Sequence, residues 1–480
     1  MESRTGKLAQ RNDAKTAVRY AVAVAALFAV LVVAQAAKRT LQLGRMRVSG
    51  VDPVEYYVFL PSLFFDGDLN FENEYAHFSP EFLRSGQWPK TATGHRAEPH
   101  GVGMAVALAP FYTAAYLVVS LEKDCFPVRP EFKYVPLFEQ AWYVGNVLWS
   151  ALAIFLLAWW LRRDVGAKRP LLIALVFFLS TPLLYYAFPL LPMSHSVSLA
   201  AILLMLLCLG NVSRTGKSRW WLLAGCWLGF AASVHILNAI YAFTILAYLL
   251  LDFAAKRRSP SAQILDVWKD ILKPPTLIFV GAFCTSMPQF IAQRIIFGSS
   301  LINPYSPEAP AAQFSLSLSS LQAAWRVAFS LKHGFITWHP ILVLGLGLVG
   351  LILITIQRKK HLALAAPGLV AVLGIWLLLS CFTNWWAGWS FGHRQFIAAY
   401  PFFALGLATL VDRFLERRRL WKAPVVWCLA GVFVLWNVLF LIQYKLGIIP
   451  RGEAITLHEY FRQKILLLSE LLTGGIKLPL

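Results

Sequence analysis

Apolar runs of about 20 residues recur along this chain and constrain its fold more than any other feature. That length is what an α-helix needs to cross the hydrocarbon core of a bilayer. Charged residues make up 14% of the sequence, whereas soluble domains average about a quarter. So few charges cannot cover the surface of a soluble fold of 480 residues. The sequence therefore predicts an all-α polytopic membrane protein, because helices satisfy their own backbone hydrogen bonds in lipid.

The basic residues indicate how the spans are oriented. The net charge is +20, and Lys and Arg gather in short clusters between apolar runs. Cytoplasmic loops of membrane proteins carry such an excess. No DNA- or RNA-binding motif accompanies the clusters, so we expect no nucleic-acid partner. The clusters lie at 162–169, 214–219, 256–258, 358–360 and 413–422.

Keeping every cluster on the cytoplasmic side predicts about eleven transmembrane helices in a single domain, 1–480. The first follows a basic leader and is too long for a typical signal peptide, so we interpret it as a retained span. The expected spans are 18–37, 138–161, 171–188, 196–211, 220–236, 239–253, 274–296, 339–357, 363–382, 397–412 and 424–442.

One further apolar run, 102–121, would move all the later basic clusters to the extracytoplasmic side if it crossed the membrane. We therefore expect it to form a juxtamembrane helix within a large first extracytoplasmic loop, 38–137. Apolar helices that do not span are tolerated where other parts of the protein cover them. The same count places the C-terminal tail outside.

The segment 38–139 contains half of the chain's 24 carboxylates. Charge concentrated in one loop beside the bilayer suggests a site. Pro53 disfavours helix at Asp52, so Asp52 is expected near a helix N-terminus, where its ionised form is favoured. An ionised carboxylate at the membrane rim can take the proton of an acceptor hydroxyl. The alternative is that Asp52 only caps the helix.

Other residues of the loop are weaker candidates. Glu55 lies one helical turn after Asp52 and is the next candidate for the base, and Tyr56 and Tyr57 are candidates for lining the substrate site. Asp66 and Asp68 flank a glycine, as in some oxygen-rich cation sites, but the calcium-loop spacing is missing. Asp-Gly is also a strong turn signal, and we favour a turn, with both aspartates near the substrate.

A second group of candidates lies in outer loops between spans. His195 follows Pro192-Met193-Ser194, and an ionisable residue at this depth is a functional candidate. It can donate to a phosphate or relay a proton, or it can simply bond a neighbouring carbonyl. His235 with Asn238 occupies a similar outer turn and is a weaker candidate.

The segment 384–394 reads Asn-Trp-Trp-Ala-Gly-Trp-Ser-Phe-Gly-His-Arg. Arg394 has a planar fork suited to phosphate oxygens, and His393 stands beside it. Trp385 and Trp386 can pack on a prenyl chain or stack on a sugar. An interfacial aromatic belt with a snorkelling Arg is the alternative. Another outer loop contains Lys332, His333 and His339, which can add positive charge near a lipid phosphate or have no such role.

The layout and motifs resemble the GT-C superfamily of membrane glycosyltransferases. That group includes oligosaccharyltransferase catalytic subunits, protein O-mannosyltransferases and lipid A aminoarabinose transferases. The resemblance covers roughly the first 250 residues: one span, a long outer loop with an early aspartate, a juxtamembrane helix and short span pairs. It includes the stretch from Asp52 to Tyr75, which resembles bacterial members of the superfamily. It implies that Asp52, soon after the first span, is the catalytic carboxylate.

The resemblance also implies a polyprenyl-phosphate-linked sugar as donor and a glycan, lipid or protein as acceptor. It places the chain in a bacterial inner membrane with the site facing the periplasm or exterior. Many relatives carry a second acidic residue on the loop after the third span, where this chain has Ser194-His195. We therefore expect no required cofactor and no metal ligand set, with a divalent cation as the alternative. No CxxC or CxxH spacing indicates zinc.

Inverting transfer is the mechanism we favour, with Asp52 as base and Arg394, helped by His195 or His393, holding the departing phosphate. A transporter or lipid flippase of the cell envelope is the alternative, although transporters usually show internal repeats and broken helices near the midplane. No repeat is visible here. A non-enzymatic scaffold would leave the carboxylate-rich loop unexplained.

Cysteine accessibility tests the predicted topology. A cysteine at Lys217 should be labelled only from the cytoplasmic side, and one at Gln463 only from outside, because the basic clusters fix the orientation. Labelling with a membrane-impermeant maleimide in intact cells measures both. Labelling of position 217 from outside would overturn the arrangement.

Overall fold

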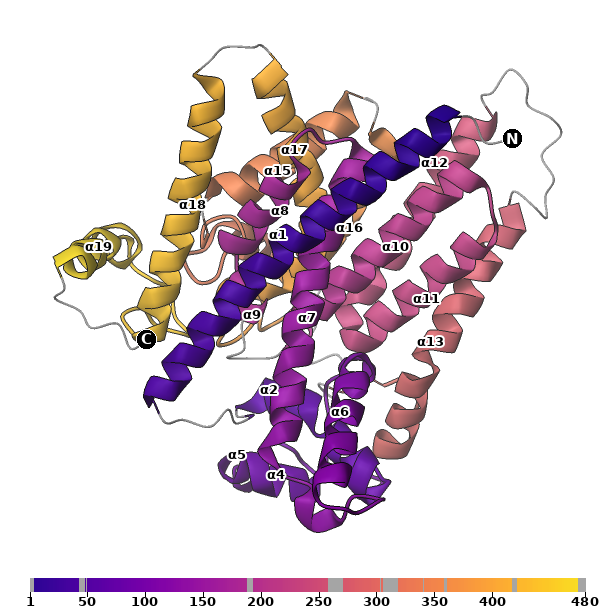
Figure 1. Cartoon of the computed structure of the whole chain (residues 1–480), viewed down its shortest axis with the longest axis vertical. Helices are drawn as coiled ribbons and strands as arrows, with labels where there is room; N and C mark the ends of the chain where they lie inside the picture. The colour runs from indigo at the N-terminus through magenta and orange to yellow at the C-terminus, as the bar shows by residue number, and fades with distance from the viewer. Residues whose placement is uncertain are drawn as a thin grey trace.

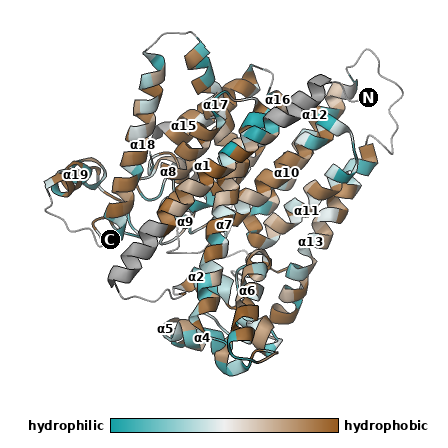
Figure 2. Ribbon diagram, viewed as in Figure 1, coloured by the Kyte–Doolittle hydropathy of each residue, from teal (hydrophilic) through white to brown (hydrophobic). Residues whose placement is uncertain are grey.

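The computed structural model describes residues 4–42, 48, 50–187, 193–257, 271–302, 304, 318–339, 341–357, 361–416 and 421–473. Within these ranges the chain is helical and contains no strand, only an isolated bridge between Lys90 and Arg96. The prediction of an all-α polytopic membrane protein is confirmed. Long apolar helices fill most of the molecule, and hydrophilic residues gather around the short helices α4 and α5 (Figure 2).

The helices follow one another along the chain with short connections. Their bounds are α1 (Arg4–Gln42), α2 (Val51–Tyr57), α3 (Phe59–Pro61), α4 (Glu72–Phe78), α5 (Pro80–Arg84), α6 (Gly103–Glu122), α7 (Pro136–Trp160), α8 (Pro170–Leu179), α9 (Leu183–Ala187), α10 (His195–Thr215), α11 (Arg219–Val234), α12 (Tyr241–Arg257), α13 (Lys273–Phe297), α14 (Leu318–Phe329), α15 (Ile341–Ile356), α16 (Leu362–Ser380), α17 (Tyr400–Glu416), α18 (Lys422–Lys445) and α19 (Gln463–Thr473). Short π or 3₁₀ segments adjoin several of them, among them 394–399 (η6) before α17.

Among the described residues, nine helices are long and apolar enough to cross a membrane. Eight of them coincide with predicted spans, and the ninth is α6, which we expected not to cross. The other three predicted spans fall on α8, α11 and α15, whose lengths are 10, 16 and 16 residues. The predicted span 171–188 is interrupted at Ser180-Thr181-Pro182, because Pro182 cannot continue the hydrogen bonding of α8.

The position of α6 is relevant to the predicted topology. Its first residue, Gly103, packs against the backbone of Ser233 and Val234. These two residues form the C-terminal end of α11, and the basic Arg219 lies at the other end of that helix. From there α6 runs beside the first half of α7, where Phe111 packs against Gly145. It lies at the same end of the molecule as α2, α4 and α5 (Figure 1). This arrangement agrees with a juxtamembrane helix, although α6 is also long enough to span, and the assignment stays a prediction.

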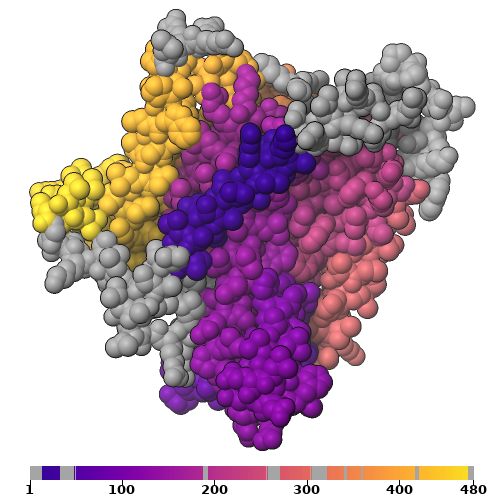
Figure 3. All heavy atoms as spheres, viewed as in Figure 1, coloured from indigo at the N-terminus to yellow at the C-terminus, as the bar shows by residue number. Residues whose placement is uncertain are grey.

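α7 is the central helix of the first half and packs against α1, α6, α8 and α10. α1 crosses the face of the bundle obliquely and lies on its surface (Figure 3). Val18, Val22 and Val30 of α1 are exposed, as expected for a helix that faces lipid. The second half is held together chiefly by α15, α16 and α17, and α11 packs along α13.

Small residues allow several of these helices to approach closely, as is common in membrane bundles. α15 meets α17 through Gly347, Gly350 and Gly406. A Cβ atom at Gly406 would lie 1.9 Å from the carbonyl oxygen of Gly347. Gly225 and Gly229 of α11 similarly face the backbone of α13. α17 follows directly on η6, so the α15–α17 contact also fixes the segment that begins at Arg394.

Replacing Gly406 should therefore destabilise the bundle. We expect Gly406→Ala to cost about 1–3 kcal/mol, the usual range for overpacking a tight contact. Gly431→Ala in α18 is the matched control, because no atom of the residues that the structure describes lies within 4 Å of a Cβ atom placed there. Alanine also forms helix better than glycine by about 1 kcal/mol. Thermal unfolding of the two purified variants in detergent measures the difference, and equal unfolding temperatures would contradict it.

Candidate active site

Asp52 and Arg394, singled out separately in the sequence, form an ion pair. Arg394 Nη1 lies 2.7 Å from Asp52 Oδ2. Asp52 is the second residue of α2, and the position before the helix is Gly50, with φ 89° and no side-chain cap. The capping alternative for Asp52 is therefore wrong. Its carboxylate points to the guanidinium instead of the helix backbone.

Arg394 is held at the start of η6, with side-chain exposure of only 16%. The preceding Gly392 has φ 67°, and any side chain there would clash with His339 and Pro182. Besides Asp52, Arg394 Nη1 contacts Met193 Sδ at 3.4 Å. Its Nε atom is buried and has no hydrogen-bond partner among the described residues. The guanidinium therefore keeps an unsatisfied donor.

Glu55 lies one turn after Asp52 and is fully buried. Its Oε1 accepts a hydrogen bond of 2.6 Å from the indole N–H of Trp88. Its Oε2 lies 3.1 Å from His100 Nε2. His100 stacks on the ring of Tyr56 with centroids 4.1 Å apart. Because both oxygens of Glu55 are engaged, it holds His100 in place and is less suited than Asp52 to act as the base.

The charges around Asp52 set its proton affinity. Burial raises the pKa of Asp52, but the Arg394 guanidinium, with a smaller contribution from His100, lowers this pKa by more, so that it lies below its ordinary value. Burial lowers the pKa of His235 to about 3, with His100 and Arg394 adding to the effect. At neutral pH the site therefore holds an ionised Asp52 and an uncharged His235.

His195 lies in the same neighbourhood. It begins α10, is buried, and its Nε2 has no hydrogen-bond partner among the described residues. Its ring meets Tyr186 edge-on, and its centroid lies 6.2 Å from that of His235. The two preceding residues contact the site directly: Met193 touches Arg394, and Ser194 Oγ lies 2.9 Å from the hydroxyl of Tyr56. Asp52, Tyr56, His195 and Arg394 thus converge from three separate parts of the chain.

Several other predicted site residues lie elsewhere. Tyr57 is buried in the core of the outer region, with its ring edge-on to Phe78 and Trp142, and its role as a lining residue stays a prediction. Asp66 forms an ion pair with Lys133, which also pairs with Glu74. Asp68 accepts hydrogen bonds from Ser62 Oγ and from the backbone of Asn70. Gly67 between them has φ 70°, which fits the turn interpretation.

The expected phosphate-binding residues other than Arg394 have structural partners. His393 Nε2 lies 2.9 Å from the carbonyl oxygen of Trp385, and His333 Nδ1 lies 2.9 Å from that of Trp386. Lys332 Nζ sits 3.6 Å above the ring of Trp386, a cation–π contact. These residues tie the 332–339 loop to the Trp-rich segment. Burial lowers the pKa of His393 to about 3 and that of His333 to about 4, so neither carries charge to a phosphate at neutral pH.

Three site residues were missed in the sequence: Trp88, Glu98 and His100. Glu98 is buried and accepts hydrogen bonds from Tyr75 and from the backbone N–H of His100. Burial and the nearby Glu55 raise the pKa of Glu98 well above its usual range. The signal was the run Glu98-Pro99-His100-Gly101 directly before an apolar helix, where two ionisable residues flank a proline.

One arrangement in the site has the composition of a cation site. Single donor atoms of Asp52, Glu55 and His100 lie within 4.8 Å of one another. Oxygen-rich sets of this kind bind divalent cations when their oxygens are free. Here Arg394 neutralises Asp52, and Trp88 and His100 occupy the oxygens of Glu55. The partners therefore favour an ion-pair network, and independence from metal stays our prediction.

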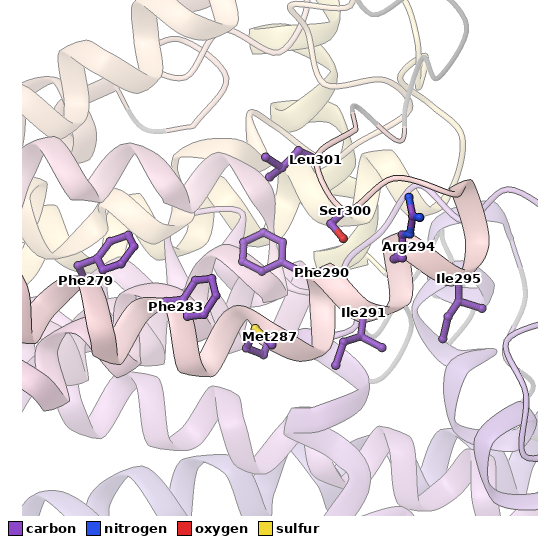
Figure 4. A pocket seen from close by; sticks show the side chains of 9 residues that line it. All are labelled: Phe279, Phe283, Met287, Phe290, Ile291, Arg294, Ile295, Ser300 and Leu301. Carbon is purple, nitrogen blue, oxygen red and sulfur yellow. The ribbon is translucent and has the colours of Figure 1, made fainter.

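A separate apolar groove of about 590 Å³ runs along the exposed side of α13 (Figure 4). It contains none of the residues of the Asp52 site. Exposed rings and aliphatic chains on a long apolar helix are what a lipid-facing surface presents. Its lining residues are Phe279, Phe283, Met287, Phe290, Ile291, Arg294, Ile295, Ser300 and Leu301.

Part of the chain is similar in sequence to one enzyme family. Residues 138–265 match the family model of dolichyl-phosphate-mannose-protein mannosyltransferase. This family is among those that the sequence resemblance named. Among solved structures, the chain is similar to the apo crystal structure of ArnT from Cupriavidus metallidurans, at 14% identity and a TM-score of 0.42. That alignment covers 94% of this chain and 78% of ArnT. No curated protein matches the chain.

The partners of the carboxylates predict the response to chelation. Because Oδ2 of Asp52 and both carboxylate oxygens of Glu55 are engaged by protein groups, we expect activity to survive EDTA unchanged. Turnover before and after chelation, followed by addition of Mg²⁺ or Mn²⁺, measures this. Loss with EDTA and recovery with a divalent cation would contradict the ion-pair interpretation and assign the cluster to a metal.

Proposed function

We propose that this protein is an integral membrane glycosyltransferase that moves a sugar from a polyprenyl-phosphate donor to an extracytoplasmic acceptor. The observation that carries the proposal is the contact between Asp52 and Arg394 at 2.7 Å. It joins a carboxylate suited to take a proton with a guanidinium suited to hold a phosphate. The match of residues 138–265 to a mannosyltransferase family supports the same chemistry.

The reaction needs a positioned base and a positive clamp. The acceptor oxygen attacks the anomeric carbon of the sugar, and the bond from that carbon to the phosphate oxygen breaks. Asp52 takes the proton of the acceptor hydroxyl, and Arg394 binds the departing polyprenyl phosphate. Attack opposite the leaving group inverts the anomeric carbon. Polyprenyl phosphate is already a good leaving group, so orientation and charge stabilisation account for most of the catalysis.

The surrounding residues have supporting roles. His195 Nε2 and Arg394 Nε, both without partners among the described residues, offer hydrogen bonds to phosphate or sugar oxygens. Glu55 and Trp88 orient His100 beside Asp52. Tyr56 is fixed by Ser194 and by its stack on His100, and so forms one wall. A low-exposure site of this kind strengthens each electrostatic contact.

The cellular setting follows from the predicted orientation. We place the protein in a bacterial inner membrane, with Asp52 facing the periplasm or exterior. The sugar is a hexose or pentose, and the acceptor a glycan, lipid or protein. The donor's isoprenoid tail remains in the bilayer while its phosphate reaches Arg394 at the membrane rim.

Asp52→Asn should abolish transfer while the protein still folds. The amide keeps the shape of the side chain but cannot take a proton, and loss of a general base typically costs about 10²–10⁴-fold in rate. Asp68→Asn is the matched control in the same loop, because Asp68 bonds only Ser62 and Asn70 among the described residues. We expect it to retain near-normal activity. The measurement is release of polyprenyl phosphate from a panel of polyprenyl-phosphate hexoses and pentoses, with a bacterial envelope fraction as acceptor.

Two results would contradict the proposal. Near-normal transfer by Asp52→Asn would remove Asp52 from the mechanism. Movement of labelled lipid across reconstituted vesicles by the wild-type protein, without cleavage of the sugar–phosphate bond, would establish a flippase instead.

A further inference from the structure

The ion pair of Asp52 and Arg394 creates a conflict between their two proposed roles. A base must be free to take a proton, yet Asp52 is neutralised by a guanidinium 2.7 Å away. A phosphate clamp must be free to bind an anion, yet the same Nη1 atom already serves Asp52. Both groups cannot make their strongest contacts at once.

We propose that the donor phosphate and Asp52 compete for Arg394, so that donor binding releases Asp52 to act as the base. This inference rests on the proposed function and specifies how its site is controlled. Before the donor binds, the ion pair with Arg394 makes Asp52 a weak base, so Asp52 takes a proton from a hydroxyl group only poorly. When the phosphate takes the guanidinium, Asp52 loses its main positive neighbour and becomes a stronger base.

The environment of the pair supports a local exchange of partners. Asp52 remains 29% exposed, so a ligand can reach the contact from the Asp52 side. Arg394 Nε has no hydrogen-bond partner among the described residues, so the guanidinium keeps a donor that Asp52 does not satisfy. Arg binds phosphate most strongly through two parallel N–H to oxygen contacts, and to present Nε with Nη2 in this way the guanidinium must turn away from Asp52. The other contact of Nη1, with Met193 Sδ at 3.4 Å, is weak and easily given up.

Three further groups lie near Asp52. A ring nitrogen of His100 lies within 4.8 Å of the Asp52 carboxylate, but His100 Nε2 is already paired with Glu55. His235 is uncharged at neutral pH, since burial lowers its pKa to about 3. Glu55 is a second carboxylate on the same helix and disfavours the ionised form of Asp52. Release of Arg394 therefore raises the affinity of Asp52 for a proton. It follows that the donor binds before the acceptor is deprotonated, which protects the site from unproductive proton transfer.

Competition has a measurable consequence that a simple clamp lacks. If Asp52 and phosphate compete, then removing the charge of Asp52 should strengthen phosphate binding even though it abolishes transfer. Coupling between ligands and groups that share a site typically amounts to roughly 5- to 150-fold in affinity. We expect Asp52→Asn to bind a polyprenyl phosphate at least about tenfold more tightly than the wild-type protein. Binding to the full chain in nanodiscs, by titration calorimetry at neutral pH, is the measurement.

Two comparisons make the result specific. Glu55→Gln removes the same charge from the same helix, but the oxygens of Glu55 bond Trp88 and His100, so its effect on phosphate affinity should be clearly smaller. In an Arg394→Ala background, Asp52→Asn should give no gain, because the group for which the two compete is gone. A double-mutant cycle over these proteins isolates the coupling.

The outcomes separate the inference from the function on which it rests. If Arg394→Ala weakens phosphate binding but Asp52→Asn leaves it unchanged, the competition is wrong and the clamp stands. If Asp52→Asn and Glu55→Gln tighten phosphate binding equally, the gain comes from the change in net charge of the site, and the proposed competition is again wrong. If Arg394→Ala binds polyprenyl phosphate as the wild-type does, the proposed donor site itself fails.

A measurement on the wild-type protein covers the case in which Asp52→Asn does not fold, since it leaves a buried arginine unpaired. Infrared difference spectra with ¹³C-labelled aspartate should show a carboxylate band that shifts when polyprenyl phosphate is added. The shift should be absent in Arg394→Ala. Phosphate binding with no change in the aspartate bands would overturn the inference.

Discussion

A charge pair in a poorly hydrated place, Asp52 with Arg394, is the contact on which the rest of the site depends. Ionised groups at the membrane are costly unless they are paired, and removing one partner of such a pair leaves the other uncompensated. The pair joins α2, in the first outer loop, to η6, at the start of α17. The third part of the site comes from the two residues before α10, where Met193 contacts Arg394 and Ser194 contacts Tyr56. The site therefore exists only when these three parts of the chain are packed together.

The carboxylate-rich first loop has a structural explanation for most of its charge. Glu72 forms a two-point pair with Arg96, and Asp66 and Glu74 share Lys133. Glu139 accepts a hydrogen bond from the backbone of Val48. These contacts join segments that are far apart in the loop, which has little regular structure of its own between α5 and α6. The concentration of charge suggested a site, and the structure shows that these carboxylates also hold the loop in place around Asp52.

The sequence predicted the architecture well because span length and charge bias are strong physical signals. Eight expected spans coincide with long apolar helices. The predicted spans agree less well with the structure where a helix is short. α8 ends before Pro182, and α11 and α15 are also short. Asp52, His195 and Arg394 were identified one by one from residue type and position. Their pairing could not be predicted, because it depends on how distant helices pack.

Several candidate residues have structural partners that their sequence positions do not reveal. His333 and His393 were expected to bind phosphate because they are polar residues in an outer loop, and in the structure one ring nitrogen of each lies 2.9 Å from a backbone carbonyl oxygen. Tyr57 was grouped with Tyr56 because the two are adjacent, yet successive helical residues point about 100° apart. Both are buried, but Tyr56 contacts Ser194 and His100, whereas Tyr57 packs against Phe78 and Trp142. His100 was overlooked because its neighbours in the fold are distant in sequence. Its role comes from Glu55 and Tyr56, which α2 brings to it.

Precise placement of Asp52 relies on packing that reaches well beyond the ion pair. The loop that carries His100 leads into α6 at Gly101 and Gly103, and both glycines lie against the backbone of Ser233 at the end of α11. Val102 donates a hydrogen bond to Gln289 of α13, so the same loop is fixed to a second helix. On the other side, Gly392 lies against His339, which bonds Asn437 of α18. In the proposed reaction, these fixed backbones place the base and the clamp in advance, and movement of side chains alone is enough for the exchange of partners between them.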